Sequence, residues 1–154
     1  MPELIFNSPI GLLTLVETDS AITSLEWRKS RINQETTTLL LAKKELAQYF
    51  GGELTEFTAP LDPSGTAFQI RVWKTIMGIP YGEQWTYSDI ANILNSSPRA
   101  VGGACGRNPI PVIIPCHRVV GSNGSLTGYT AADGIKTKSF LLEHEEHKPR
   151  LLGI

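Results

Sequence analysis

The chain changes its hydrophobic pattern near residue 60, and this change limits the folds that it can adopt. From residue 4 to residue 27 the apolar residues alternate in three short runs separated by turn-forming residues, which is typical of antiparallel strands. A helical pattern follows over residues 37–50, and two glycines come directly after it. Turn formers, prolines among them, then fill positions 59–65. We therefore expect a small N-terminal β-meander with a helix over residues 1–60, followed by a linker.

Helical spacing dominates from Thr66 onward. Phe68, Val72 and Ile76 recur every four residues, and Trp73 and Met77 widen the apolar stripe. A second helix is expected to begin at a capping box formed by Thr86 and Asp89. A third is expected at Pro98, with Ser97 as its cap. Two short helices joined by a tight turn have the layout of a helix-turn-helix. The fold class is therefore predicted to be α+β, with a mainly helical C-terminal domain over residues 66–147 and a tail at 148–154.

The third helix is poor in side-chain bulk. Residues 98–104 include two glycines, each of which costs about 1 kcal/mol inside a helix. A helix that reads the major groove carries long polar side chains instead. The small residues allow either tight packing on a neighbouring helix or close approach to a narrow minor groove, with Arg99 reaching into the duplex. Spacing alone favours the packing interpretation.

Composition and cysteine usage exclude several classes of protein. The chain has 154 residues, of which 41% are hydrophobic and 19% charged, values typical of a globular protein. Its apolar runs are shorter than the roughly 20 residues that span a bilayer, and its N-terminus lacks the layout of a signal peptide. Cys105 and Cys116 are not arranged as CxxC, which disfavours a disulfide scaffold or a redox pair. We expect free thiols, a cytoplasmic location and no membrane association.

The charges are distributed unevenly along the chain. The net charge is −1, yet residues 66–122 carry five basic and two acidic residues, while residues 1–65 carry five basic and nine acidic ones. A nearly neutral chain can still present one basic face to a phosphate backbone. A chance imbalance would give the same count.

A thiol, an imidazole and a guanidinium follow one another at Cys116, His117 and Arg118, with apolar residues on both sides. A lone cysteine in such surroundings is usually core. A neighbouring histidine or arginine, however, lowers the pKa of a thiol and favours the nucleophilic thiolate. Asn108 precedes a strand-like stretch at 110–114 and either makes a turn or fixes the cysteine loop. These residues alone support catalysis and packing about equally.

Glu145 offers a partner for the histidine. It lies four residues after Leu141 on a predicted helix, so a buried Leu141 would turn Glu145 toward the core. A buried carboxylate needs a partner, and a histidine would complete a Cys–His–Glu relay. Alternatively, Glu145 is an exposed member of the polar run 143–147.

A loop that contains several glycines covers residues 121–129 and ends at an aromatic residue. It has a tight turn at Asn123-Gly124 and suits either the rim of a pocket or a simple turn.

The run NPIPVIIPCHRVVG at residues 108–121 is a specific motif. Further motifs in matching order cover nearly the whole chain: Ser8–Gly11, Gly65–Phe68, Val72-Trp73, Ile79–Glu83, Thr86-Tyr87, Arg99–Ala104 and Leu141–Glu145. On these motifs the chain resembles the O6-alkylguanine-DNA alkyltransferases, which move an alkyl group from damaged DNA onto their own cysteine. The resemblance implies a winged helix-turn-helix and, as partner, double-stranded DNA that bears alkylated guanine. It further implies no cofactor, a monomer in solution with cooperative binding on DNA left open, and single-turnover repair of O6-alkylguanine and O4-alkylthymine.

The resemblance also assigns roles to individual residues. Cys116 would accept the alkyl group, His117 would activate it through a water, Glu145 would support His117, and Asn108 would hold the site together. Arg99 would fill the gap left by a flipped nucleotide, and Tyr87 would crowd the 3′ phosphate. The full set assigned to DNA is Arg99, Tyr87, Ser88, Ala100, Gly103 and Ser122. The set assigned to the substrate pocket is Tyr129, Thr130, Val119 and Ala131.

Three departures from the family pattern bear on these roles. Thr130-Ala131-Ala132 stands where relatives have Ser-Gly-Gly or Ala-Gly-Gly, and the added methyl groups restrict the backbone and would narrow the pocket. Cys105 adds a second thiol, expected to be structural, on the helix that would face DNA. No Cys or His precedes Cys105, so the zinc that some relatives carry is not expected.

Two other functions fit parts of the pattern. A lesion sensor would bind alkylguanine without reacting, but non-reacting relatives replace the acceptor cysteine. A thiol hydrolase would use the same three side chains on a small ester, which the helix-turn-helix fits poorly.

Overall fold

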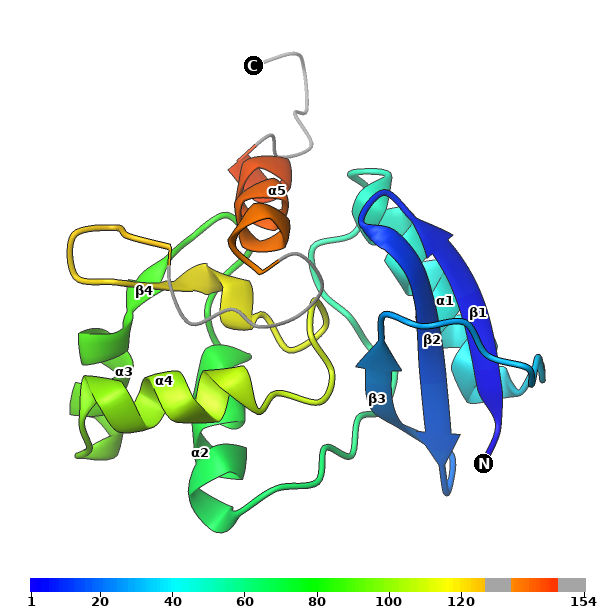
Figure 1. The fold of residues 1–154 in the computed structure, drawn as a ribbon, viewed down its shortest axis with the longest axis horizontal. Helices are drawn as coiled ribbons and strands as arrows, with labels where there is room; N and C mark the ends of the chain where they lie inside the picture. Colours follow the sequence, from blue (N-terminus) through cyan, green and yellow to red (C-terminus); the bar gives the residue numbers. More distant parts are fainter. Residues whose placement is uncertain (127–133, 147–154) are drawn as a thin grey trace.

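The computed structural model describes residues 1–126 and 134–146. Its first half is an antiparallel sheet in the order β1 (Glu3–Ser8), β2 (Gly11–Thr18) and β3 (Ala21–Glu26). Leu15 pairs with Leu4 on one side and with Leu25 on the other, and all three side chains are buried. Figure 1 shows this sheet on the right, in blue, and the helices of the second half on the left. The predicted meander is confirmed.

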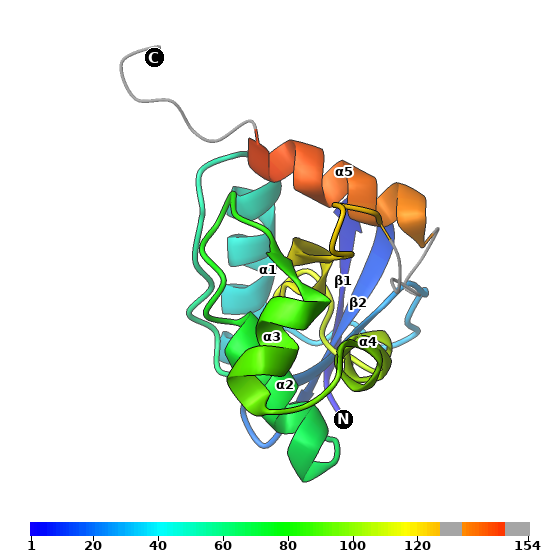
Figure 2. The same cartoon turned by 90° about the vertical axis from the view of Figure 1, so that its left-hand side faces the viewer.

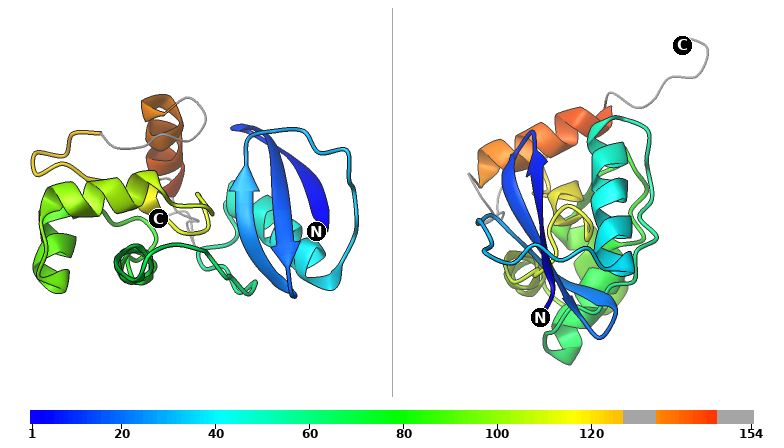
Figure 3. Two further views of the ribbon diagram at one scale, coloured as in Figure 1. Left: turned by 60° about the horizontal axis from the view of Figure 1, so that its bottom comes forward. Right: turned by 90° about the vertical axis from the view of Figure 1, so that its right-hand side faces the viewer.

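Helix α1 (Thr37–Phe50) lies along one face of the sheet (Figure 3). It begins at Thr36, whose side chain accepts a hydrogen bond from Leu39 N at 3.1 Å and so satisfies one of the free donors of the first turn. Leu39 and Leu46 are fully buried against the strands. The bounds agree with the helix predicted at 37–50, because its apolar stripe and both ends are encoded locally.

The second half contains α2 (Ala67–Ile76), β4 (Trp85–Thr86), α3 (Tyr87–Leu94) and α4 (Pro98–Gly106). It continues with the 3-10 turn η1 (Cys116–Arg118), β5 (Val119–Val120) and α5 (Ile135–Glu146). Figure 2 shows α3 and α4 in front, with α5 lying across the top. Together with the sheet and α1, this confirms the predicted α+β fold class.

The two helices of the helix-turn-helix begin where the sequence predicts. Asp89 N donates to Thr86 Oγ1 at 3.0 Å and Thr86 N donates to Asp89 Oδ2 at 2.8 Å, which completes the capping box. Ala100 N donates to Ser97 Oγ at 3.1 Å at the start of α4. Asn95 has a φ of 54° and ends α3 in the left-handed region, which an asparagine tolerates better than most residues.

Two details differ from the sequence prediction. Met77 is 48% exposed and caps the end of α2, so it does not widen the buried stripe of that helix. Residues 110–114 form a turn and not a strand: Ile114 N bonds back to Ile110 O at 2.9 Å, and Val112 has a φ of +74°. Pro111 and Pro115 lack the N–H groups that a strand ladder needs. The stretch is apolar because it is buried, not because it is extended.

Short contacts join the two halves along β3. Ile22 N donates to Pro60 O and Asp62 N donates to Ile22 O, both at 2.8 Å, so the linker pairs with the edge of the sheet. Leu25 N donates to Pro109 O at 3.0 Å in the loop after α4. A parallel pair, β4 with β5, ties the start of α3 to the strand that leaves Cys116. The loop that carries the cysteine is therefore fixed from both halves.

Beyond β5 the predicted tight turn at Asn123-Gly124 is present. Gly121 N donates to Ser125 O at 2.8 Å and Gly124 has a φ of +80°, a conformation that favours glycine. Across residues 1–126 and 134–146, none of the helices has both the length and the apolar character of a membrane span.

Candidate active site

Asn108 holds the loop that presents Cys116. Its Nδ2 donates to Ile114 O at 2.9 Å and to Cys116 Sγ at 3.3 Å, while its Oδ1 accepts from Ile110 N at 2.9 Å. One amide thus binds both ends of the turn at 110–114 and the sulfur itself. Because a hydrogen bond to sulfur favours the charged form, Asn108 lowers the pKa of the thiol.

Other neighbours keep the thiol protonated at rest. A hydrogen bond with the Cys105 thiol and burial raise the pKa of Cys116 well above its ordinary value, and Asn108 and the Lys138 charge oppose this only in part. Cys116 is 2% exposed, and both cysteines are free thiols. The site needs a base to form the thiolate.

His117 is placed to be that base. Its Nε2 lies 2.7 Å from Glu145 Oε2, and both side chains are buried. A carboxylate only accepts hydrogen bonds, so Nε2 carries the proton and Nδ1 holds a lone pair. Among the described residues, Nδ1 has no hydrogen-bond partner although it is buried. Burial lowers the pKa of His117 despite Glu145, which raises it, so the imidazole is neutral near pH 7.

Glu145 is ionised despite its burial. Burial raises its pKa, but the hydrogen bonds and charges of His117 and Arg118 outweigh that effect and lower the pKa to about 2. Arg118 Nε and Nη2 donate to the two carboxylate oxygens at 2.8 and 3.1 Å, and Nη1 donates to Ile79 O at 2.7 Å. The predicted placement of Glu145 is confirmed: Leu141 is 0% exposed and Glu145 1% exposed, which excludes the exposed alternative.

The small residues of helix α4 lie in different surroundings on its two sides. A Cβ atom at Gly102 would lie 3.8 Å from the ring of Tyr87, an ordinary packing distance, whereas one at Gly103 would meet nothing within 4 Å among the described residues. Arg99 and Gly103 are exposed, and they are one helical turn apart. The packing interpretation is therefore confirmed for the Gly102 side of the helix, while the side with Arg99 and Gly103 is open and leaves close approach to a minor groove as a prediction.

The other positions assigned to DNA lie in different surroundings. Ser122 is exposed in the turn after β5, and Ser88 and Ala100 are half-buried near the starts of α3 and α4. Tyr87 is 9% exposed, and its hydroxyl lies 3.4 Å from Lys138 Nζ. Of the four pocket positions, Val119 is buried and its carbonyl accepts from Lys138 Nζ at 2.6 Å. Tyr129, Thr130 and Ala131 lie outside the described residues.

The chain matches two sequence families over almost its full length. One is described as "6-O-methylguanine DNA methyltransferase, DNA binding domain" and covers residues 67–147, and the other is the "ribonuclease-like domain" of the same proteins and covers residues 3–63. The chain belongs to the 6-O-methylguanine DNA methyltransferase family. The methylated-DNA–protein-cysteine methyltransferase of Mycobacterium tuberculosis H37Rv is 44% identical over 151 residues, which cover 92% of this chain and 90% of that protein.

Solved structures agree with this family. The crystal structure of the M. tuberculosis O6-methylguanine methyltransferase has a TM-score of 0.86 at 42% identity and covers 97% of this chain and 94% of its own. The M. tuberculosis protein named OGT, crystallised in complex with DNA, has a TM-score of 0.84 at 43% identity, with 95% and 93% of the two chains covered.

Three side chains that contact or influence the Cys116, His117 and Glu145 site were not among the site residues predicted from the sequence. Tyr49 donates its hydroxyl to Glu145 Oε2 at 2.6 Å from the end of α1. Arg118 was noted only as a neighbour of the thiol, and Lys138 not at all. Lys138 is fully buried, burial lowers its pKa, and its charge acts on both thiols. The adjacency of Arg118 to His117 was a usable signal, whereas the other two contacts depend on how distant segments pack.

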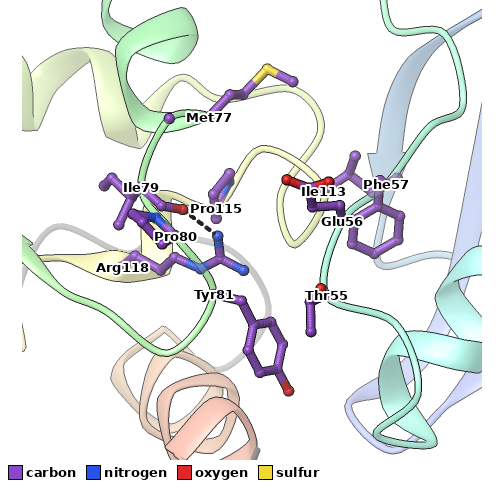
Figure 4. A pocket seen from close by; sticks show the side chains of 11 residues that line it. Thr55, Glu56, Phe57, Met77, Ile79, Pro80, Tyr81, Ile113, Pro115 and Arg118 are labelled. Carbon is purple, nitrogen blue, oxygen red and sulfur yellow. Dashed lines mark hydrogen bonds between the residues drawn. The ribbon is translucent and has the colours of Figure 1, made fainter.

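A cavity of about 440 Å³ opens between the two halves beside the relay. Residues 55–57 form one wall and residues 77–81 another, and the Arg118 guanidinium lies between them, bonded to Ile79 O (Figure 4). Neither Cys116 nor His117 lines it, so this cavity does not lead to the Cys116 thiol. Within the described ranges, no group of three or more His, Cys, Asp or Glu side chains is placed to hold a metal ion.

Proposed function

We propose that the chain repairs DNA by moving the alkyl group of O6-alkylguanine, and of O4-alkylthymine, onto Cys116 in a single turnover. The observation that carries this proposal is the buried relay. Glu145 binds His117 Nε2, His117 Nδ1 has no hydrogen-bond partner among the described residues, and the preceding residue in the chain is the thiol that Asn108 binds. The family's printed description, 6-O-methylguanine DNA methyltransferase, supports this choice of substrate.

The chemistry balances without a cofactor. His117 Nδ1 takes the Cys116 proton through a bridging water, and the neighbouring Lys138 charge and the Asn108 amide favour the resulting thiolate. The sulfur attacks the alkyl carbon, the bond from carbon to O6 breaks, and its electron pair stays on the purine. The proton that His117 took up then passes through the solvent to the purine anion, which restores neutral guanine and neutral His117. The product is a thioether that no neighbouring group hydrolyses, so each chain acts once.

The target base must leave the duplex to reach a buried thiol. Extrusion costs a few kcal/mol, and less for a damaged pair. We propose that α4 enters the minor groove with its Gly103 face, that Arg99 fills the gap in the base stack, and that Tyr87 crowds the 3′ phosphate. The exposure of Arg99 and the open space at Gly103 support this geometry, and the M. tuberculosis protein crystallised in complex with DNA supports DNA as the partner. We further assign contacts with the duplex to Ser88, Ala100 and Ser122, and a pocket to Tyr129, Thr130, Val119 and Ala131.

We also propose that residues 1–60 and 66–147 are two domains with a tail at 148–154, which the family matches at 3–63 and 67–147 support. We propose that the chain acts as a monomer in solution, with cooperative binding on DNA left open. A cytoplasmic location suits its two free thiols.

Transfer of a tritiated methyl group from an O6-methylguanine duplex tests the function. We expect a plateau at one methyl group per chain, no transfer by Cys116→Ser, and retained transfer by the matched thiol variant Cys105→Ser. Tight binding without transfer would support a lesion sensor instead, and repeated turnover on an ester would support a hydrolase.

A further inference from the structure

We propose that Tyr49 is a positioning residue for alkyl transfer: through its hydroxyl, the N-terminal half fixes Glu145 and moderates its pull on His117. This inference rests on the proposed function of the relay. It adds a residue from the sheet-and-helix half to a relay whose other side chains, Cys116, His117, Arg118 and Glu145, all come from the second half.

The geometry places Tyr49 inside the relay. Its hydroxyl donates to Glu145 Oε2 at 2.6 Å, and the same oxygen lies 2.7 Å from His117 Nε2. Tyr49 is 0% exposed and Glu145 1% exposed, so water does not compete for this contact. The two residues are 96 positions apart in the chain, and the end of α1 is brought to α5 by the fold alone.

The direction of the hydrogen bond is fixed by the protonation states. Burial and the Glu145 charge raise the pKa of Tyr49, so the phenol keeps its proton. The pKa of Glu145 is lowered to about 2, so its carboxylate accepts. Tyr49 is thus a donor to Glu145 over the whole working pH range.

A second hydrogen bond holds the end of α1 against α5. His144 Nε2 lies 2.6 Å from Tyr49 O, and the two rings have centroids 5.1 Å apart. Consecutive residues of α5 therefore bind the backbone and the hydroxyl of one tyrosine. The two contacts together fix the position of the Glu145 carboxylate relative to the imidazole of His117.

Sharing an oxygen has a chemical consequence. Tyr49 and Arg118 Nη2 both donate hydrogen bonds to Oε2, and this draws negative charge away from the side of the oxygen that faces His117. The carboxylate therefore stabilises protonated His117 less strongly than it would without these two donors. The groups that face this pair are Tyr49 from α1, Tyr81 from the loop after α2, Arg118 from η1 and Lys138 from α5. Of these, Tyr49 is the group that both donates to Oε2 and can lose a single oxygen atom without altering a charge at the relay. Its loss would return electron density to Oε2 and make His117 more basic.

Tyr49→Phe tests the inference, with Tyr81→Phe as the matched control. Tyr81 lies beside Tyr49 at a ring distance of 6.2 Å, and its buried hydroxyl has no hydrogen-bond partner among the described residues. Both variants lose one phenol oxygen from neighbouring rings beside the relay. Two readouts apply: the pKa of His117 from an NMR titration, and the acid limb of the rate of transfer from an O6-methylguanine oligonucleotide.

We expect Tyr49→Phe to raise the pKa of His117 and to move the acid limb upward by about one pH unit, a tenfold change in protonation, as expected for one hydrogen bond to a charged group. Tyr81→Phe should leave both unchanged. A Tyr49→Phe variant that is uniformly slower at every pH, with an unmoved pKa of His117, would reduce Tyr49 to a packing residue and overturn the inference.

A second substitution covers the case in which Tyr49→Phe does not fold. Replacement of Tyr49 by a ring-fluorinated tyrosine keeps the shape and strengthens the donor, so the pKa of His117 should fall instead of rise. An unmoved or higher pKa would overturn the inference. The NMR titration needs no substrate, so it distinguishes failure of this inference from failure of the proposed function, which would appear as a lack of transfer by the unmodified chain.

Discussion

Replacing Glu145 by glutamine gives the sharpest test of the relay, because it removes one charge and keeps the shape. From the described residues the carboxylate accepts four hydrogen bonds, one each from Tyr49 and His117 and two from Arg118. Glutamine presents an NH₂ group to at least one of these donors. It also leaves the Arg118 guanidinium, only 7% exposed, without its counter-charge.

Two independent estimates of the cost agree. Breaking a buried ion pair by removing one partner costs about 3–5 kcal/mol. The pKa of Glu145 falls from 4.5 to about 2 on folding, and at 1.36 kcal/mol per pKa unit this corresponds to about 3 kcal/mol of stability at neutral pH. We therefore expect Glu145→Gln to lower the free energy of unfolding by about 3–4 kcal/mol.

Urea denaturation followed by tryptophan fluorescence at pH 7 measures this difference. Glu146→Gln is the matched control, since Glu146 is the next residue on α5 and is exposed; its change should stay within about 0.5 kcal/mol. The stabilisation by Glu145 is present above its unfolded pKa of 4.5 and is lost as the pH falls toward 2. The gap between the unmodified chain and Glu145→Gln should therefore narrow across that window. A loss below about 1 kcal/mol at pH 7, typical of a surface pair, would refute the reasoning.

Three further predictions concern transfer and binding. Asn108→Ala should lower the free energy of unfolding by about 1–3 kcal/mol, because it leaves the Ile110 amide without its partner and removes one of the two hydrogen bonds to the Ile114 carbonyl, which keeps the bond from Cys116 N. It should slow transfer as well; an unchanged urea midpoint and rate would contradict the role of Asn108. Arg99→Ala should slow repair of a methylated duplex more than reaction with free O6-methylguanine base, and equal losses in the two rate assays would count against base flipping. The pH–rate profile of the unmodified chain should stay level down to about pH 6.5 and decline only below it, because burial lowers the pKa of His117; a decline that began above pH 7 would remove His117 as the base.

Local patterns allowed much of the fold to be predicted. The capping box of Thr86 and Asp89 and the Ser97-Pro98 start of α4 depend on neighbours within three residues, so the sequence displays them directly. Glu145 could be placed because its spacing from Leu141 fixes its side of α5. The turn at 110–114 was misinterpreted, since a buried apolar run reads as a strand unless the prolines are given more weight.

The remaining contacts depend on packing between distant segments. Tyr49 and Lys138 reach the site from α1 and α5, and each reads in the sequence as an ordinary member of an amphipathic helix. Whether a buried tyrosine donates to a carboxylate or fills space is decided by the partner that the fold brings to it. The outward face of α4 was ambiguous for the same reason, because Gly102 and Gly103 look alike in sequence while only Gly102 lies near Tyr87.

The central claim is that one sulfur atom receives the alkyl group and keeps it. Mass spectrometry of the intact chain after mixing with an O6-methylguanine duplex, followed by peptide fragmentation, tests this most directly. The account predicts a mass increase of one CH₂ per chain, located on Cys116 and stable on dilution. An unmodified Cys116 peptide beside a repaired duplex, or a methyl group located on Cys105, would contradict it.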